Sequence, residues 1–146
     1  MEPKFAGGAS FRYFETSALV AAGLEGDTTA VRAIRGEGLR IASALTFAET
    51  RRTLAVAVVR GRISQQQLRS RLAWLRRFER LCEIVDISSS VLARVGRAFP
   101  VEPVRSLDAI HLATVETLEA DPALVAVVTR DRRVRENALA MGYAVE

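Results

Sequence analysis

Residues 124–131 read LVAVVTRD, an uninterrupted apolar run that ends in threonine, arginine and aspartate. An apolar run without alternating polar positions is typical of a strand buried on both faces, as in a parallel sheet covered by helices. Asp131 then follows the carboxyl end of that strand. Ligands of open α/β sheets bind at this end of the strands, so Asp131 is a candidate site residue.

Other strand-like runs are also followed by helical patterns. The sequence predicts strands at residues 11–14, 39–42, 82–87, 124–129 and 143–145, and helices from 17 onward and at 28–36, 45–59, 64–80, 88–99, 106–119 and 134–141. Ser17 is the expected N-cap of the first helix, and Ser64 and Gln67 have capping-box spacing. The third and fourth helices are expected to form a hairpin. The repeated strand-then-helix order predicts an α/β fold with a doubly wound, mostly parallel sheet.

The composition excludes several classes of protein. With 49% hydrophobic and 26% charged residues, the chain is neither disordered nor fibrous. Its apolar runs are far shorter than the roughly 20 residues that cross a bilayer, and residues 1–10, which read MEPKFAGGAS, lack the apolar core of a secretory signal. Cys82 has no cysteine partner, so we expect a reducing, cytoplasmic location. The length of 146 residues favours a single domain with residues 1–10 as a loose arm.

The charge favours an acidic partner. The chain has 21 Lys and Arg residues, of which only Lys4 is lysine, and its net charge is +4. Arginine suits the recognition of phosphates and carboxylates. A GC-rich genome would explain the preference for arginine over lysine equally well.

Four carboxylates lie where a strand-like run gives way to a helix or in the first turn of a helix: Glu15, Glu49, Asp108 and Asp131. If they converge at the sheet edge, they repel one another unless a cation lies among them. Each also has a simpler explanation. Glu15 favours a helix N-terminus, Glu49 has capping-box spacing with Thr46, and the two aspartates suit turns or caps.

The sequence around the four acids carries more information than the acids alone. The segments are FETSALV around Glu15, TFAETRRTL around Glu49, RSLDAIHLATV around Asp108 and VVTRDRRVRENALAMGY around Asp131. In their residues and their order along the chain, these motifs resemble those of the PIN-domain nucleases, specifically the VapC-type toxins of toxin-antitoxin modules. The resemblance covers nearly the whole chain. The resemblance implies one PIN domain over residues 1–146, with a PIN-like doubly wound α/β/α sandwich and a protruding helical hairpin.

The resemblance also implies an activity, that of a metal-dependent endoribonuclease. The four acids would bind Mg²⁺ or Mn²⁺, which would activate a water for in-line attack on an RNA phosphodiester. The hydroxyls of Thr16, Ser17 and Thr129 could hold a ligand carboxylate or a metal-bound water. Arg130 and Arg132 could guide the RNA backbone. Capping explains Ser17 as well, and a solvated helix face explains the arginines.

The implied partners are a cognate antitoxin, an RNA such as transfer or ribosomal RNA, and a second copy of the chain in a homodimer. Trp74 either stacks on a base or fills a helix interface. His111, the only histidine, is expected to pack or form hydrogen bonds rather than to act as a general base.

Glu15 departs from the family, whose members usually carry aspartate at this position. Its extra methylene leaves open an alternative, a catalytically silent PIN-like module that binds RNA or antitoxin without cutting. Two other fold families are excluded by the sequence. A receiver domain uses a lysine near its last strand, whereas Lys4 is the only lysine; a dinucleotide-binding domain needs G-x-G-x-x-G, whereas residues 15–20 read ETSALV.

Overall fold

The computed structural model describes residues 11–146, so the expected N-terminal arm lies outside the described residues. Within this range the sheet has five strands in the order β3-β2-β1-β4-β5. Their bounds are β1 Phe11–Phe14, β2 Leu39–Ser43, β3 Glu83–Val85, β4 Val125–Val128 and β5 Ala144–Val145. Every neighbouring pair is parallel. The parallel sheet predicted from the sequence is confirmed.

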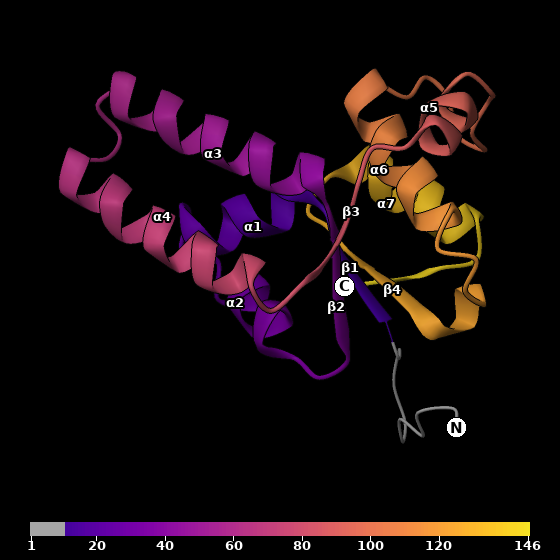
Figure 1. The fold of residues 1–146 in the computed structure, drawn as a ribbon, viewed down its shortest axis with the longest axis horizontal. Helices are drawn as coiled ribbons and strands as arrows, with labels where there is room; N and C mark the ends of the chain where they lie inside the picture. Colours follow the sequence, from indigo (N-terminus) through magenta and orange to yellow (C-terminus); the bar gives the residue numbers. More distant parts are fainter. Residues whose placement is uncertain (1–10) are drawn as a thin grey trace.

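The first strand, β1, lies at the centre of the sheet; β2 and β3 follow it outward to one edge, and β4 and β5 fill the other side. The helices are α1 Thr16–Gly23, α2 Thr28–Arg35, α3 Ala44–Val59, α4 Gln65–Glu79, α5 Ser89–Val95, α6 Ser106–Glu116 and α7 Arg132–Ala140. Figure 1 shows α1 to α4 on one side of the sheet and α5 to α7 on the other. This is the doubly wound α/β/α arrangement, whose switch point lies between β1 and β4.

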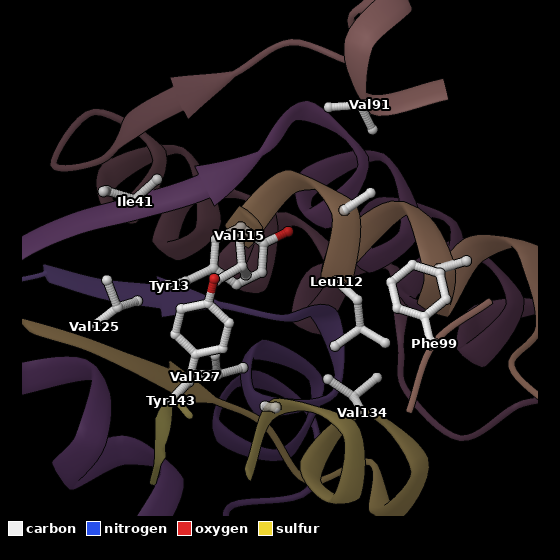
Figure 2. Close-up of a cluster of buried hydrophobic side chains, with 13 residues drawn as sticks. Tyr13, Ile41, Val91, Phe99, Leu112, Val115, Val125, Val127, Val134 and Tyr143 are labelled. Carbon is white, nitrogen blue, oxygen red and sulfur yellow. The ribbon is translucent and has the colours of Figure 1, made fainter. Parts of the chain in front are cut away.

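Neighbouring residues of β1 serve the two opposite cores. Tyr13 is fully buried with Leu112 and Val127 on the side of α6, as Figure 2 shows. Phe14 is fully buried in the other cluster, where its ring meets Phe78 edge to face at 5.1 Å. This alternation follows from the period of two residues in a strand. All four residues of β4 are buried, as the apolar run predicted.

Helices α3 and α4 form the predicted hairpin, which extends away from the sheet in Figure 1. The capping box at the start of α4 is confirmed, since Gln67 N donates to Ser64 Oγ at 3.1 Å and Ser64 N to Gln67 Oε1 at 2.8 Å. A separate apolar cluster of Leu54, Ala57 and Ile63 fills the space between the two helices. Burial of these side chains holds the hairpin together.

Trp74 occupies a helix interface, so the packing interpretation is confirmed. Its ring stacks on Phe78 with centroids 6.2 Å apart. The indole also lies against α1, where a Cβ built on Gly23 would come within 2.6 Å of it. Glycine at position 23 therefore allows α1 and α4 to approach closely.

Several predicted boundaries are wrong by a few residues. The strand expected at 82–87 is confined to Glu83–Val85, and the helix expected to reach 99 ends at Val95. Leu124 belongs to a short 3₁₀ turn, Pro122–Leu124, rather than to β4. None of the helices within residues 11–146 has the length and apolar character needed to cross a membrane.

Candidate active site

The four predicted acids come from four elements that meet at the carboxyl edge of the sheet. Glu15 directly follows β1, and Asp131 follows the neighbouring strand β4. Glu49 lies in the second turn of α3, and Asp108 lies in the first turn of α6, as predicted. A continuous set of side-chain contacts joins these elements.

Glu15 is 4% exposed and is the N-cap of α1. Its Oε2 accepts hydrogen bonds from Ser17 N at 3.1 Å, from Ser17 Oγ and from Thr129 Oγ1 at 2.7 Å. The prediction that Ser17 caps this helix is therefore wrong: the longer side chain of Glu15 reaches back over the first turn and satisfies a free N–H. Within residues 11–146, Glu15 Oε1 accepts no hydrogen bond and remains available.

Thr129 connects the acids of the two central strands. Its hydroxyl donates to Glu15 Oε2 and accepts from Asp131 N at 3.0 Å. Asp131 in turn caps α7, with Oδ1 accepting from Val134 N at 2.9 Å. This cap explains why α7 begins at Arg132, two residues before the predicted start. Capping engages only one of the two oxygens of Asp131.

Glu49 is fixed by two donors on one oxygen. Its Oε1 accepts from Thr16 Oγ1 at 2.7 Å and bonds to His111 Nε2 at 2.7 Å. Although partial burial alone would raise it, the pKa of the Glu49 carboxyl is lowered, because the hydrogen bonds from His111 and Thr16 favour the charged form. Glu49 is ionised and held in place at neutral pH.

The capping-box explanation of Glu49 is wrong. The N-cap of α3 is Ser43, whose Oγ accepts from Leu45 N at 3.0 Å. Thr46 lies inside the helix and donates to the carbonyl of Phe14 at 3.0 Å. The same spacing of threonine and glutamate therefore serves a tertiary contact here instead of a cap.

His111 is 1% exposed and links Glu49 to the sheet. Its Nδ1 lies 2.7 Å from the hydroxyl of Tyr13. Burial and the charge of Glu15 raise the pKa of Tyr13, so its hydroxyl keeps its proton and donates to Nδ1. The Nε2 of His111 then carries the ring proton and donates to Glu49. The prediction of a packing and hydrogen-bonding role for this histidine is confirmed.

The carboxyl of Asp108 is partly buried near two other acids. Its pKa is raised by burial, then by the negative charges of Asp131 and Glu15. Within residues 11–146 no hydrogen bond contributes to this shift. A cation placed among these carboxylates would remove the repulsion that opposes ionisation of Asp108.

The donor set fits a hard divalent cation such as Mg²⁺ or Mn²⁺. The hydrogen bonds of Glu15, Glu49 and Asp131 each occupy one carboxylate oxygen, which leaves the other free for a ligand. No three acid, histidine or cysteine side chains in the described part of the chain lie close enough to form a ready cage. Mg²⁺ keeps several waters and needs only one or two direct carboxylates, so a loose ring of acids suits it.

The two candidate arginines differ. Arg130 is anchored by an ion pair with Asp27 at 3.5 Å and a bond to the Thr129 carbonyl at 3.2 Å, and its N–H donates to Ser17 Oγ at 2.7 Å. Its side chain is engaged in the fold. The side chain of Arg132 is 91% exposed, and among residues 11–146 its ion-pair partner is Glu136 on its own helix, at 2.8 Å. Arg132 is therefore the one accessible to a polyanion.

The sequence did not reveal the contact between His111, Tyr13 and Glu49. The only signal was the spacing of Asp108 and His111, which places both on neighbouring positions of one helix face. That spacing does not identify the partner, because Tyr13 and Glu49 belong to distant parts of the chain.

Comparisons with known proteins agree with this arrangement. A sequence model of the PIN domain matches residues 12–139. Ribonuclease VapC35 of Mycobacterium tuberculosis is 39% identical over 137 residues, which cover 91% of this chain and 93% of that protein. Ribonuclease VapC46 of the same organism is 34% identical over 135 residues, covering 91% and 94%.

Solved structures show the same fold. The structure of VapBC2 from Rickettsia felis, bound to a DNA fragment from their promoter, is matched with a TM-score of 0.64 at 14% identity, over 93% of this chain and 97% of that one. VapC20 of Mycobacterium tuberculosis, a Sarcin-Ricin loop cleaving toxin, gives 0.62 at 15% identity, over 91% and 96%. The sandwich expected from the sequence is thus the fold of these proteins.

Proposed function

Because the chain belongs to the PIN-domain family and is of the VapC type, we propose that it is a metal-dependent endoribonuclease, the toxin of a toxin-antitoxin pair. The observation that carries this proposal is the arrangement of the acids at one edge of the sheet: Thr129 joins Glu15 and Asp131, whose charges act on Asp108, and Thr16 and His111 anchor Glu49. The names of the two mycobacterial relatives support the same activity.

The free carboxylate oxygens would hold the metal: Oε1 of Glu15, Oε2 of Glu49, Oδ2 of Asp131 and the carboxylate of Asp108. When bound, Mg²⁺ or Mn²⁺ would supply an activated water and would neutralise charge that develops on the phosphoryl oxygens. Burial and then the negative charges of Asp131 and Glu15 raise the pKa of Asp108, and a divalent cation would relieve this repulsion.

The residues of the chain orient these acids. Thr129 and Ser17 fix one oxygen of Glu15, and His111 and Thr16 fix one oxygen of Glu49. Each acid thereby presents its second oxygen without having to be ordered when the substrate arrives. Arg132, which is exposed beside Asp131, adds a positive charge for the RNA backbone.

The alternative function is a catalytically silent module that binds RNA or antitoxin without cutting. It is favoured by one observation: Glu15, which replaces the usual aspartate, accepts from three donors on one oxygen, and one of them, Ser17 N, forms the helix cap. The extra methylene alters where the remaining oxygen lies, and Mg²⁺ tolerates little deviation from octahedral geometry.

Cleavage of total RNA in Mg²⁺ and in Mn²⁺ distinguishes the two functions. The protein is compared with its Glu15→Asp and Asp108→Ala variants. Cleavage by the unchanged protein and none by Asp108→Ala supports the active nuclease. Cleavage only after Glu15→Asp supports the silent module, and a protein that binds RNA but cuts in neither form contradicts the nuclease proposal.

The partners belong to the same proposal. The likeness to VapBC2 supports a cognate antitoxin, and the acidic edge would receive a basic side chain of that antitoxin. We also propose that the protein forms a homodimer, that it is cytoplasmic, and that residues 1–146 form a single domain. Light scattering of the purified protein, alone and after co-expression with a candidate antitoxin, tests the assembly.

A further inference from the structure

A basic groove lies along α3 and the turn that follows this helix. It has a volume of about 230 Å³ and is lined by Arg52, Thr53, Val56, Ala57, Arg60 and Arg62. The three arginines are exposed, and within residues 11–146 none of them forms an ion pair. All charges in the groove are therefore positive and unneutralised.

This groove lies on the same side of α3 as Glu49. Thr53, Val56 and Arg60 follow Glu49 at intervals of four, three and four residues, which places them on one face of a helix. The opposite side of α3 faces α4, as shown by the ion pair of Arg51 with Glu79 and by Leu54 in the interhelical cluster. The groove thus begins about one turn beyond Glu49.

From these observations we propose that the groove binds the backbone of the single-stranded RNA that extends from the cleavage site; this inference rests on the proposed function. From Glu49 to Arg60 the helix rises about 16 Å, at ~1.5 Å per residue. A stacked strand covers that distance with about five nucleotides, at ~3.4 Å each. RNA that enters the acidic edge therefore reaches the arginines a few nucleotides from the cut.

The lining determines what is recognised. Arginine donors match phosphate oxygens, whereas Val56 offers apolar surface without hydrogen-bonding groups for a base edge; Ala57 also lines the groove but is only 2% exposed. No aromatic side chain lines the groove to stack on a base. The groove should therefore increase affinity for any single strand without selecting its sequence.

The test measures RNA binding without cleavage. Fluorescence anisotropy follows a random-sequence, single-stranded RNA of about 20 nucleotides, long enough to span site and groove, in EDTA over a range of salt concentrations. The groove variant carries Arg52→Gln, Arg60→Gln and Arg62→Gln. The control carries Arg69→Gln, Arg76→Gln and Arg77→Gln, which removes the same charge from exposed positions of α4.

The groove variant should bind about tenfold more weakly near 0.1 M salt, and the slope of log K against log salt should decrease by about 2, since each single-strand phosphate contact contributes ~0.7. The control variant should show much smaller changes in both the affinity and the salt slope. Replacing the three groove arginines by lysine should restore the slope, because the charge returns. Circular dichroism confirms that each variant is folded.

Equal losses of RNA affinity in the groove variant and the control variant would mean a general charge effect and would overturn the proposal. Unchanged binding by the groove variant would also overturn it and would leave the groove to an acidic segment of a protein partner. Because binding is measured without divalent metal, a failure of the nuclease proposal appears separately, as absence of cleavage in Mg²⁺ and Mn²⁺ with the salt slopes unaffected.

Discussion

His111 Nε2 lies 2.7 Å from Glu49 Oε1, although the two residues belong to helices that pack on opposite faces of the sheet. The contact passes over the carboxyl end of β1, where the hydroxyl of Tyr13 forms a hydrogen bond with Nδ1 of the histidine. Groups that orient a metal ligand in this way commonly influence metal affinity by 10- to 100-fold. His111 is therefore a positioning residue for Glu49.

Replacing His111 by Asn should weaken Mn²⁺ binding by about one order of magnitude, because Glu49 loses its strongest donor. Isothermal titration with Mn²⁺ measures this directly. Tyr13→Phe keeps the ring and removes only the hydroxyl that holds Nδ1, so its effect should be smaller. An unchanged Mn²⁺ affinity in His111→Asn would contradict the positioning role.

Thr129→Val should lower the free energy of unfolding by about 1 to 3 kcal/mol, because Asp131 N and the buried Glu15 each lose a partner. Urea unfolding monitored by circular dichroism gives the difference. Thr129→Ser is the control: it keeps the hydroxyl and should retain RNA cleavage. Equal loss of cleavage in the two variants would show that the hydroxyl is not the important group.

Asp131 is the N-cap of α7 and, in the proposed function, a metal ligand, and the two roles can be separated. Asp131→Asn keeps an oxygen that can accept from Val134 N, so the protein should remain within about 0.5 kcal/mol of its original stability, yet lose cleavage. Asp131→Ala should also lose cleavage and should unfold about 1 kcal/mol more easily. Denaturation and RNA cleavage of the same preparations compare the two, and identical stabilities would argue against the cap.

Asp108 should make the stability of the metal-free protein depend on pH. Its pKa is raised in the folded state, so the folded protein binds a proton that the unfolded chain has released, and stability falls as pH rises through that range. Asp108→Asn should therefore melt at a higher temperature than the original protein near neutral pH. The difference in melting temperature between the two proteins should disappear once the solution is acidic enough to protonate Asp108 in both the folded and the unfolded chain.

Thermal melts in EDTA over a series of buffers measure this dependence. Glu49 provides the opposite sign: its lowered pKa contributes stability that is present above the unfolded value and is lost as pH falls through the folded one. Mg²⁺ should raise the melting temperature of the original protein and leave Asp108→Asn nearly unchanged. If Mg²⁺ raised the melting temperature of both proteins equally, Asp108 would not be a ligand of the metal.

Gly23→Ala should destabilise the protein, although alanine is the better helix former by about 1 kcal/mol. The new methyl would lie 2.6 Å from the indole of Trp74, and relieving such a clash typically costs about 1 to 3 kcal/mol. Combining Gly23→Ala with Trp74→Leu should remove most of the penalty. Unfolding free energies of the two single variants and the double variant form the cycle that tests the contact.

Local patterns in the sequence were sufficient to predict the sheet and the approximate location of the site. The apolar run of β4 is buried on both faces, and Ser64 with Gln67 forms the expected capping box, because both depend on nearby residues. The convergence of acids follows from the rule that parallel strands present their carboxyl ends at one edge.

The remaining details depend on distant contacts. Glu15 rather than Ser17 caps α1, and its position is completed by Thr129 from another strand. Thr46 has capping-box spacing with Glu49, but its hydroxyl is drawn to the carbonyl of Phe14. Spacing along the chain cannot distinguish these outcomes, because each depends on how strands and helices are aligned in three dimensions.

Two of the acids are helix caps as well as candidate metal ligands, and this has a consequence for how the proposed toxin activity can be lost by mutation. Most substitutions at Glu15 or Asp131 remove a cap along with a ligand, so cells that carry them should contain less folded protein. Asp108 caps no helix, so changing it should leave an intact but inert protein. Under the proposed function such an allele would still bind antitoxin, and in a cell that also carries the active gene it would withdraw antitoxin from the active toxin.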